Sequence, residues 1–169
     1  LVFAWILWRH LADPGYNSLF DGLNLVIHEA GHLAFSWFGE WIGVAGGTLF
    51  QLAAPVAAGI LFHRQRDYFA VAVALFWLGT NLVDVGIYVA DARAQLLPLV
   101  SPTSGDPLHD WYYLLAHAGL LRHDQALGGA FRALGLGSMA LSLLWGGWMV
   151  RVMTGCGGEE RSAGGGTES

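Results

Sequence analysis

Charge and cysteine are both scarce in this 169-residue chain, and each scarcity excludes a class of protein. Asp, Glu, Lys and Arg together make up 12% of the sequence, about half the share found in ordinary soluble domains. Only eight residues are basic, the net charge is −5 and there is no basic patch, so we expect no nucleic-acid partner. Cys156 is the single cysteine, which excludes an intramolecular disulfide and a zinc site built on cysteines.

Apolar residues take the place of the missing charge. They make up 54% of the chain, and the mean hydropathy is +0.47. Since a helix needs about 20 largely apolar residues to cross a bilayer, the apolar runs predict an all-α integral membrane helical bundle. We expect about four main transmembrane helices, over residues 17–38, 48–62, 68–90 and 127–150, and a shorter helix after Pro107. Tryptophans near the ends of these runs are typical of membrane interfaces.

The two ends of the chain differ from this membrane domain, which we place at residues 17–153. Residues 1–16 begin inside an apolar run that is too short to span a bilayer, so we expect a shortened helix or an interfacial anchor. Residues 154–169 are rich in Gly, Ser and Glu and are predicted to be a disordered tail. The distribution of arginines places the loop that contains Arg64 and Arg66 in the cytoplasm.

The strongest motif lies in the first apolar run, at Leu25–Phe35. It contains His28-Glu29-Ala-Gly-His32, and residues four apart lie on one face of a helix, so His28 and His32 can bind one metal ion. Neutral imidazole suits Zn²⁺, and Glu29 can take a proton from metal-bound water without binding the metal. Chance predicts roughly 0.01 such matches at this composition. The alternative is a pair of buried histidines with Glu29 in a polar cluster. It is disfavoured because a carboxylate inside a membrane helix costs about 2.5–3.5 kcal/mol.

A carboxylate for the same metal is expected from the run at residues 68–90, which contains Asn81 and Asp84 on one helical face. The runs at 17–38 and 68–90 cross the bilayer in the same direction. At 1.5 Å per residue the histidines lie about 15–21 Å from the start of the first run, and Asp84 lies about 24 Å from the start of the other. We therefore predict Asp84 as the third ligand. His109 and Asp110 are also ligand types, but the sequence favours a capping or interface role for Asp110.

This arrangement resembles the site-two protease family of intramembrane zinc metalloproteases, over about Leu23–Ala92. That family has a His-Glu-x-x-His helix and a later helix with an Asp ligand, usually in an Asp-Gly pair preceded by an Asn. Here the corresponding stretch is Asn81-Leu-Val-Asp84-Val-Gly86, so the Asn and Asp are present but the Asp-Gly pair is not.

The resemblance implies a zinc metallopeptidase of the bacterial cytoplasmic membrane that hydrolyses peptide bonds of membrane-anchored proteins. It implies Zn²⁺ on His28, His32 and Asp84, with Glu29 as the base and Asn81 or Gln51 supporting the oxyanion. One alternative is a non-catalytic subunit of a membrane complex, with a structural metal closed by four protein ligands or a polar helix-packing site. Another is passage of metal ions or protons along the polar stripe from Asn17 to His32.

Overall fold

The structure, a computed structural model, describes residues 1–13, 15–98 and 109–163, with side chains as far as residue 154. Within these ranges the chain forms helices and no strand, which confirms the predicted all-α fold. The α-helices are α1 (Val2–Ala12), α2 (Asp21–Phe35), α3 (Glu40–Arg64), α4 (Tyr68–Ala90), α5 (Asp110–His117) and α6 (Asp124–Ala163). Two short 3₁₀ helices, η1 (Ser36–Phe38) and η2 (Leu121–His123), lead into α3 and α6.

Three described helical segments are long and apolar enough to cross a membrane: α3, α4 and Leu121–Thr154, which contains most of α6. The integral membrane bundle is confirmed, and among the described residues three segments meet this length and composition where about four were expected. The first expected span, at 17–38, is shorter than predicted because α2 begins only at Asp21 and ends at Phe35. Gly39, at a φ of 94° that favours glycine, then turns the chain into α3.

Two further boundaries differ from the sequence prediction. The glycine-rich stretch at 39–47 was expected as a loop. In the structure α3 begins at Glu40, so Gly46 and Gly47 are part of this helix. Close packing against α2 stabilises helix there despite the poor helix propensity of glycine. The backbone of α6 continues to Ala163, so residues 154–163 are helical rather than part of a tail, while the rest of the predicted tail lies outside the described residues.

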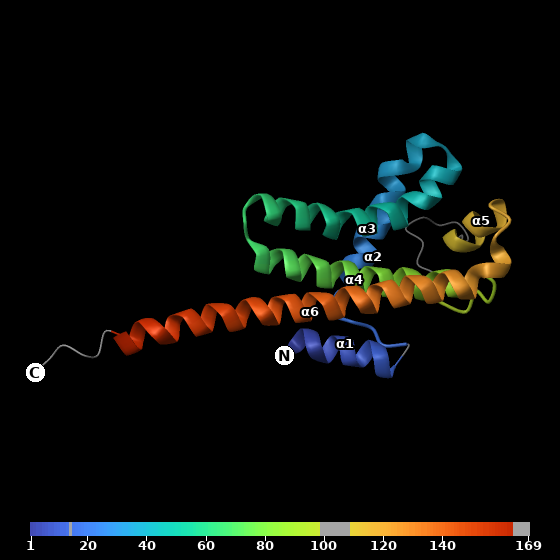
Figure 1. Ribbon diagram of the computed structural model, residues 1–169. Coiled ribbons are helices and arrows are strands. Elements are labelled where there is room, and N and C mark those ends of the chain that lie inside the picture. The colour runs from blue at the N-terminus through green and yellow to red at the C-terminus, as the bar shows by residue number, and fades with distance from the viewer. Residues whose placement is uncertain (14, 99–108, 164–169) are drawn as a thin grey trace, which may run out of the picture.

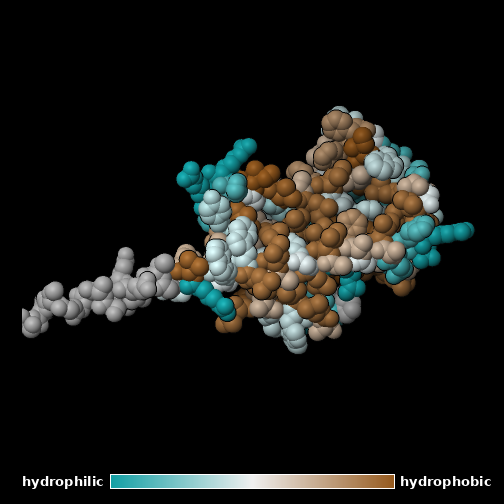
Figure 2. Space-filling model, in the orientation of Figure 1, coloured by the Kyte–Doolittle hydropathy of each residue, from teal (hydrophilic) through white to brown (hydrophobic). Residues whose placement is uncertain are grey.

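The long helices α3, α4 and α6 run side by side, and α2 crosses their common direction (Figure 1). α1 lies along α6, where Ile6 joins Phe76 of α4 and Met139 of α6 in a buried cluster. The Phe3 ring stacks on Phe76 at a centroid distance of 4.3 Å. Apolar side chains cover most of the face seen in Figure 2, as expected for a surface in contact with lipid.

Glycines hold α4 and α6 together at two levels. A Cβ on Gly135 would lie 2.6 Å from the Gly79 carbonyl, and a Cβ on Gly86 would lie 2.7 Å from the Gly128 carbonyl. The two glycines of each helix are seven residues apart, which is two helical turns on one face. Side-chain bonds add to the contact, since Ser142 Oγ donates to the Ala72 carbonyl at 2.5 Å. Such small-residue contacts are the usual means of close helix packing in membranes.

A paired glycine substitution tests this interface. Gly135→Ala should lower the free energy of unfolding by about 1–3 kcal/mol, because the new methyl overlaps α4. Gly137→Ala is the matched control two residues later, where a Cβ meets nothing within 4 Å. It should be neutral or stabilise the helix by up to about 1 kcal/mol. Thermal unfolding in detergent measures both. Equal stabilities of the two variants would contradict close packing at Gly135.

Candidate metal centre

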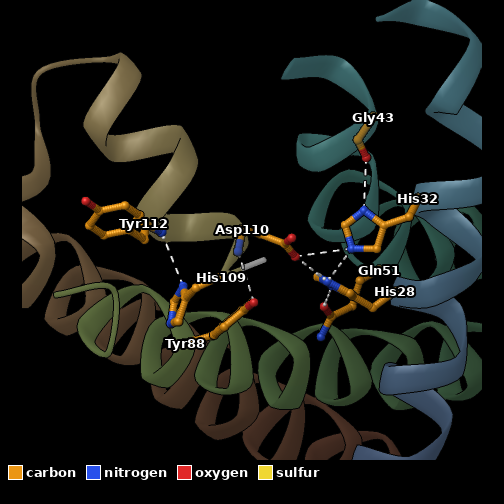
Figure 3. Close-up of polar contacts among 8 residues, drawn as sticks. All are labelled: His28, His32, Gly43, Gln51, Tyr88, His109, Asp110 and Tyr112. Carbon is orange, nitrogen blue, oxygen red and sulfur yellow. Dashed lines mark hydrogen bonds and ion pairs between the residues drawn. The ribbon is translucent and has the colours of Figure 1, made fainter. Parts of the chain in front are cut away.

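Three potential metal ligands converge at the meeting point of α2 and α5 (Figure 3). His28 Nε2 and His32 Nε2, one turn apart on α2, lie 3.0 Å from each other. Asp110 Oδ2, from the first residue of α5, lies 2.9 Å from His28 Nε2 and 3.2 Å from His32 Nε2. His28 and Asp110 are buried and His32 is half-buried. The sequence prediction that the two histidines share one site therefore agrees with their positions, while metal binding itself stays a prediction.

Each imidazole is oriented through its other ring nitrogen. His32 Nδ1 lies 2.9 Å from the Gly43 carbonyl, which can only accept, so this nitrogen carries the proton. His28 Nδ1 lies 3.0 Å from Gln51 Oε1, which accepts in the same way. Both neutral rings then present the unprotonated Nε2 to the shared point. Outer contacts of this kind are typical of metal-binding histidines, because they fix the ring orientation and the tautomer.

The unprotonated Nε2 atoms of His28 and His32 and the Asp110 carboxylate are all electron-rich, and they lie within 3.2 Å of one another. A positive charge between them is needed to offset their repulsion. A proton is one solution. The hydrogen bond to Asp110, opposed by partial burial, raises the pKa of His32 to about 9. Burial alone would raise the pKa of Asp110, but hydrogen bonds from His28 and His32 hold it below its usual value. A metal ion is the other solution. Ligand atoms about 2.0–2.1 Å from a tetrahedral zinc are about 3.3–3.4 Å apart, close to the spacings observed here.

Asp110 is held in place from α4 and from its own helix. Its backbone N–H donates to Tyr88 Oη at 3.1 Å. His109 caps α5 by accepting the Tyr112 N–H on Nδ1 at 3.2 Å, and its Nε2 lies 3.4 Å from Asp91. The Tyr88 and His109 rings pack at a centroid distance of 4.4 Å (Figure 3). The capping role expected of Asp110 from the sequence therefore belongs to His109, and Asp110 faces the histidines.

Asp84 does not join the histidines. Its Oδ2 accepts from Asn24 Nδ2 at 2.6 Å, and Asn24 Oδ1 accepts from Trp77 Nε1 at 2.8 Å. Asn24 is one turn before His28, and Asp84 is one turn before Tyr88, whose ring lies 6.2 Å from that of His28. The α4 position level with His28 is thus occupied by Tyr88, about 6 Å further along the helix than Asp84.

The predicted third ligand is corrected for a geometric reason. The depth estimate assumed a first span that starts near residue 17 and runs parallel to the span at 68–90. In the structure α2 starts at Asp21 and crosses α4 (Figure 1). Asp110 was seen as a ligand type but not as a ligand, because it lies 82 residues from His28 with no spacing signal. The one sequence signal for Asp110 as a ligand was its place next to His109 at the start of a helix.

The two side chains predicted to act beside the metal lie in different places. Glu29 is half-buried on α2, and the structure shows no contact between its carboxylate and the two imidazoles or Asp110, all of which it describes. Asn81 lies fully buried on α4 and donates from Nδ2 to the Trp77 carbonyl at 2.9 Å. Its Oδ1 has no hydrogen-bond partner in the described part of the chain. Asn81 is therefore outside the three-residue group, whereas Gln51 contacts it directly.

Glycines of α3 leave space beside the imidazoles. A Cβ on Gly47 would lie 2.6 Å from both His28 Nε2 and His32 Nε2. A Cβ on Gly31 would overlap the Gly46 carbonyl, so α2 and α3 approach each other backbone to backbone. The absence of side chains at these positions brings Gln51 and the Gly43 carbonyl within reach of the histidines and keeps the Nε2 atoms open on the α3 side.

The chain is similar to a curated bacterial protein, the apolipoprotein N-acyltransferase of Prochlorococcus marinus (strain MIT 9313). The two are 32% identical over 160 aligned positions, and the match covers 87% of this chain and 30% of the relative. The chain therefore spans less than a third of the length of this relative. No protein-family model matches the chain, and no solved structure matches it.

These comparisons correct the predicted family and function. The similar protein is named as an acyltransferase, so the resemblance to site-two proteases and the inferred peptidase activity are wrong. The motif misled because it specifies a pair of histidines and a carboxylate on one helix, which many chemistries can use. The location in a membrane is confirmed by the three apolar helices, and the bacterial relative agrees with the predicted bacterial origin.

Proposed function

We propose that the chain is the membrane part of an enzyme that transfers an acyl group to nitrogen, and that its reaction centre binds a zinc ion. The observation that carries the proposal is the convergence of His28 Nε2, His32 Nε2 and Asp110 Oδ2 within hydrogen-bond distance of one another. The printed name of the similar bacterial protein supports acyl transfer to nitrogen as the reaction, with an apolipoprotein as its substrate.

The donor set favours zinc over a hard cation. Two neutral imidazole nitrogens and one carboxylate oxygen are a usual zinc set, whereas magnesium and calcium prefer oxygen ligands throughout. Among the described residues the group contains three potential ligands. Three protein ligands and one open position are typical of catalytic zinc, and a structural zinc is closed by four. This supports a reactive centre over a purely structural one.

The chemistry of acyl transfer fits the side chains at this centre. With an acyl ester as donor, the amine nitrogen bonds to the acyl carbon and the carbon–oxygen bond of the ester breaks. A base must take a proton from the attacking amine, and the same proton can pass to the leaving oxygen. Glu29, which follows His28 in the sequence and is half-buried, is our candidate for this base, and the Gln51 and Gly43 contacts orient the imidazoles. A bound zinc would stabilise negative charge on the acyl oxygen.

Zinc binding is tested by comparing two carboxylate variants. Wild-type protein should bind one zinc ion, and Asp110→Asn should weaken binding by more than the 10–100-fold typical of outer contacts, because a ligand is lost. Asp84→Asn is the matched control, since this carboxylate contacts Asn24 instead. It should bind zinc as wild type does. Metal analysis of protein titrated with zinc in detergent measures both. Zinc loss in Asp84→Asn with retention in Asp110→Asn would contradict the proposed ligand set.

Gly47 offers a second test that leaves every ligand in place. Gly47→Ala should weaken zinc binding at least about tenfold, because its methyl group fills the space beside both Nε2 atoms. Gly43→Ala lies one turn earlier on α3, where a Cβ makes only ordinary contacts of 3.5 Å or more, and its carbonyl is unchanged. It should bind zinc normally. Equal affinities of the two variants, with both proteins folded, would show that the space beside the imidazoles is not used.

The reaction is tested separately from the metal. The protein in liposomes should transfer a labelled acyl group from a lipid ester to the amine of an apolipoprotein, and Glu29→Gln should slow this by about 10²–10⁴-fold. Glu29→Gln should keep its zinc, because Glu29 is not among the converging ligands. Amide product analysed by mass spectrometry is the readout. Normal zinc binding with no amide formed by the wild type would overturn acyl transfer and leave the metal centre standing.

A further inference from the structure

A second potential binding site lies at the opposite end of α3 from the metal centre. An open cavity of about 330 Å³ is formed between the α3–α4 connection and α6. Its lining includes Arg66, Tyr68, Phe69, Trp148, Val152 and Met153. Most of this lining is apolar or aromatic, yet Tyr68, Phe69, Trp148 and Met153 are 46–61% exposed. The residues of the metal centre contribute nothing to it.

The position of the cavity along the helices is that of a membrane–water boundary. The spanning helix α3 ends at Arg64 and the spanning helix α4 begins at Tyr68, so the cavity opens where both leave the apolar region. Tyr and Trp are the side chains that prefer this depth. In Figure 2 hydrophilic side chains gather at the end of the molecule where α3 meets α4, directly beside apolar ones.

The charge at this end of the molecule is positive. Arg64 is the last residue of α3, Arg66 lies in the α3–α4 connection, and Arg151 lies on the α6 segment that lines the cavity. Asp67 is the acidic residue of the lining, but its Oδ1 accepts the Ala70 N–H at 2.9 Å and caps α4. Its carboxylate is therefore engaged with the helix, and the arginines are available for an anion.

Arg66 stands at a backbone position that favours glycine. Its φ is 60°, and the end of α3 is a Schellman motif in which Arg66 N–H donates to the His63 carbonyl and Asp67 N–H to the Phe62 carbonyl, both at 3.0 Å. Glycine adopts this left-handed conformation without steric cost, whereas other residues are destabilised in it. Local structure therefore does not explain the arginine, but a charge at the mouth of the cavity does.

We propose that this cavity binds an anionic phospholipid, with its phosphate on Arg66 and its acyl chain along Phe69, Trp148 and Val152. Charge complementarity selects the headgroup, and the apolar lining below it selects a chain rather than a free ion. Each basic residue near a membrane surface strengthens binding of an anionic lipid by about fivefold. The site lies in the leaflet opposite the metal centre, so its lipid anchors the helical bundle and is not a reactant.

Lipid-dependent stability of two Arg66 variants tests the proposal. Phosphatidylglycerol added to the detergent-solubilised full chain should raise the unfolding temperature of the wild type more than phosphatidylcholine does. Arg66→Gly should be at least as stable as the wild type without lipid, because glycine relieves the left-handed strain. The same variant should need about five times more phosphatidylglycerol for the same shift. Arg122→Gly, in η2, is the control and should keep the wild-type response.

Three results would overturn the proposal. One is an equal shift in the unfolding temperature of the wild type with phosphatidylglycerol and with phosphatidylcholine, which would show that the site does not distinguish an anionic headgroup. Another is an unchanged phosphatidylglycerol response in Arg66→Gly. The third is an equal shift with inorganic phosphate alone, which would indicate an anion site without a lipid chain. Trp148→Ala extends the test to the chain, since it should reduce the phosphatidylglycerol response while leaving Arg66 intact.

Discussion

The candidate metal centre depends on the close approach of α2 to the first turns of α3. Gly31 meets the Gly46 carbonyl without an intervening side chain, and Gly47 lies against both imidazoles. A larger residue at either position would separate the helices and remove the Gly43 carbonyl and Gln51 from the histidines. Without those two partners the imidazoles would lose the tautomer that directs both Nε2 atoms to Asp110. The same device, glycine against backbone, holds α4 to α6.

Part of this arrangement could be predicted from the sequence. The four-residue spacing of His28 and His32 fixes their common face, because helix geometry alone determines it. Long apolar runs likewise predicted α4 and the part of α3 after residue 47, since a bilayer requires length and apolar composition. The bounds of α2 could not be predicted in the same way. A turn at residues 17–20 and Gly39 shorten it, and both depend on local contacts such as the bond from Ser18 N–H to Asp21.

The carboxylate beside the two histidines could not be predicted from the sequence. Asp84 is half-buried on α4 and Asp110 is buried on α5, and only tertiary packing decides which of the two carboxylates reaches the histidines. Asp84 is one turn too early on α4, where it bonds to Asn24, and Tyr88 occupies the level of His28. Tyr88 in turn holds the backbone of Asp110. A shift of about 6 Å along α4 therefore decides which carboxylate lies beside the histidines, and neither composition nor spacing predicts that shift.

The placement of Asp110 also bears on how the three-residue group is assembled during folding. His28 and His32 lie one turn apart on α2, and Asp110 follows 82 residues after His28. Formation of α2 alone brings the two imidazoles together, but it leaves the carboxylate out. The carboxylate arrives when α5 docks on Tyr88. The three-residue group is thus complete only in a chain whose α4–α5 contact has already formed.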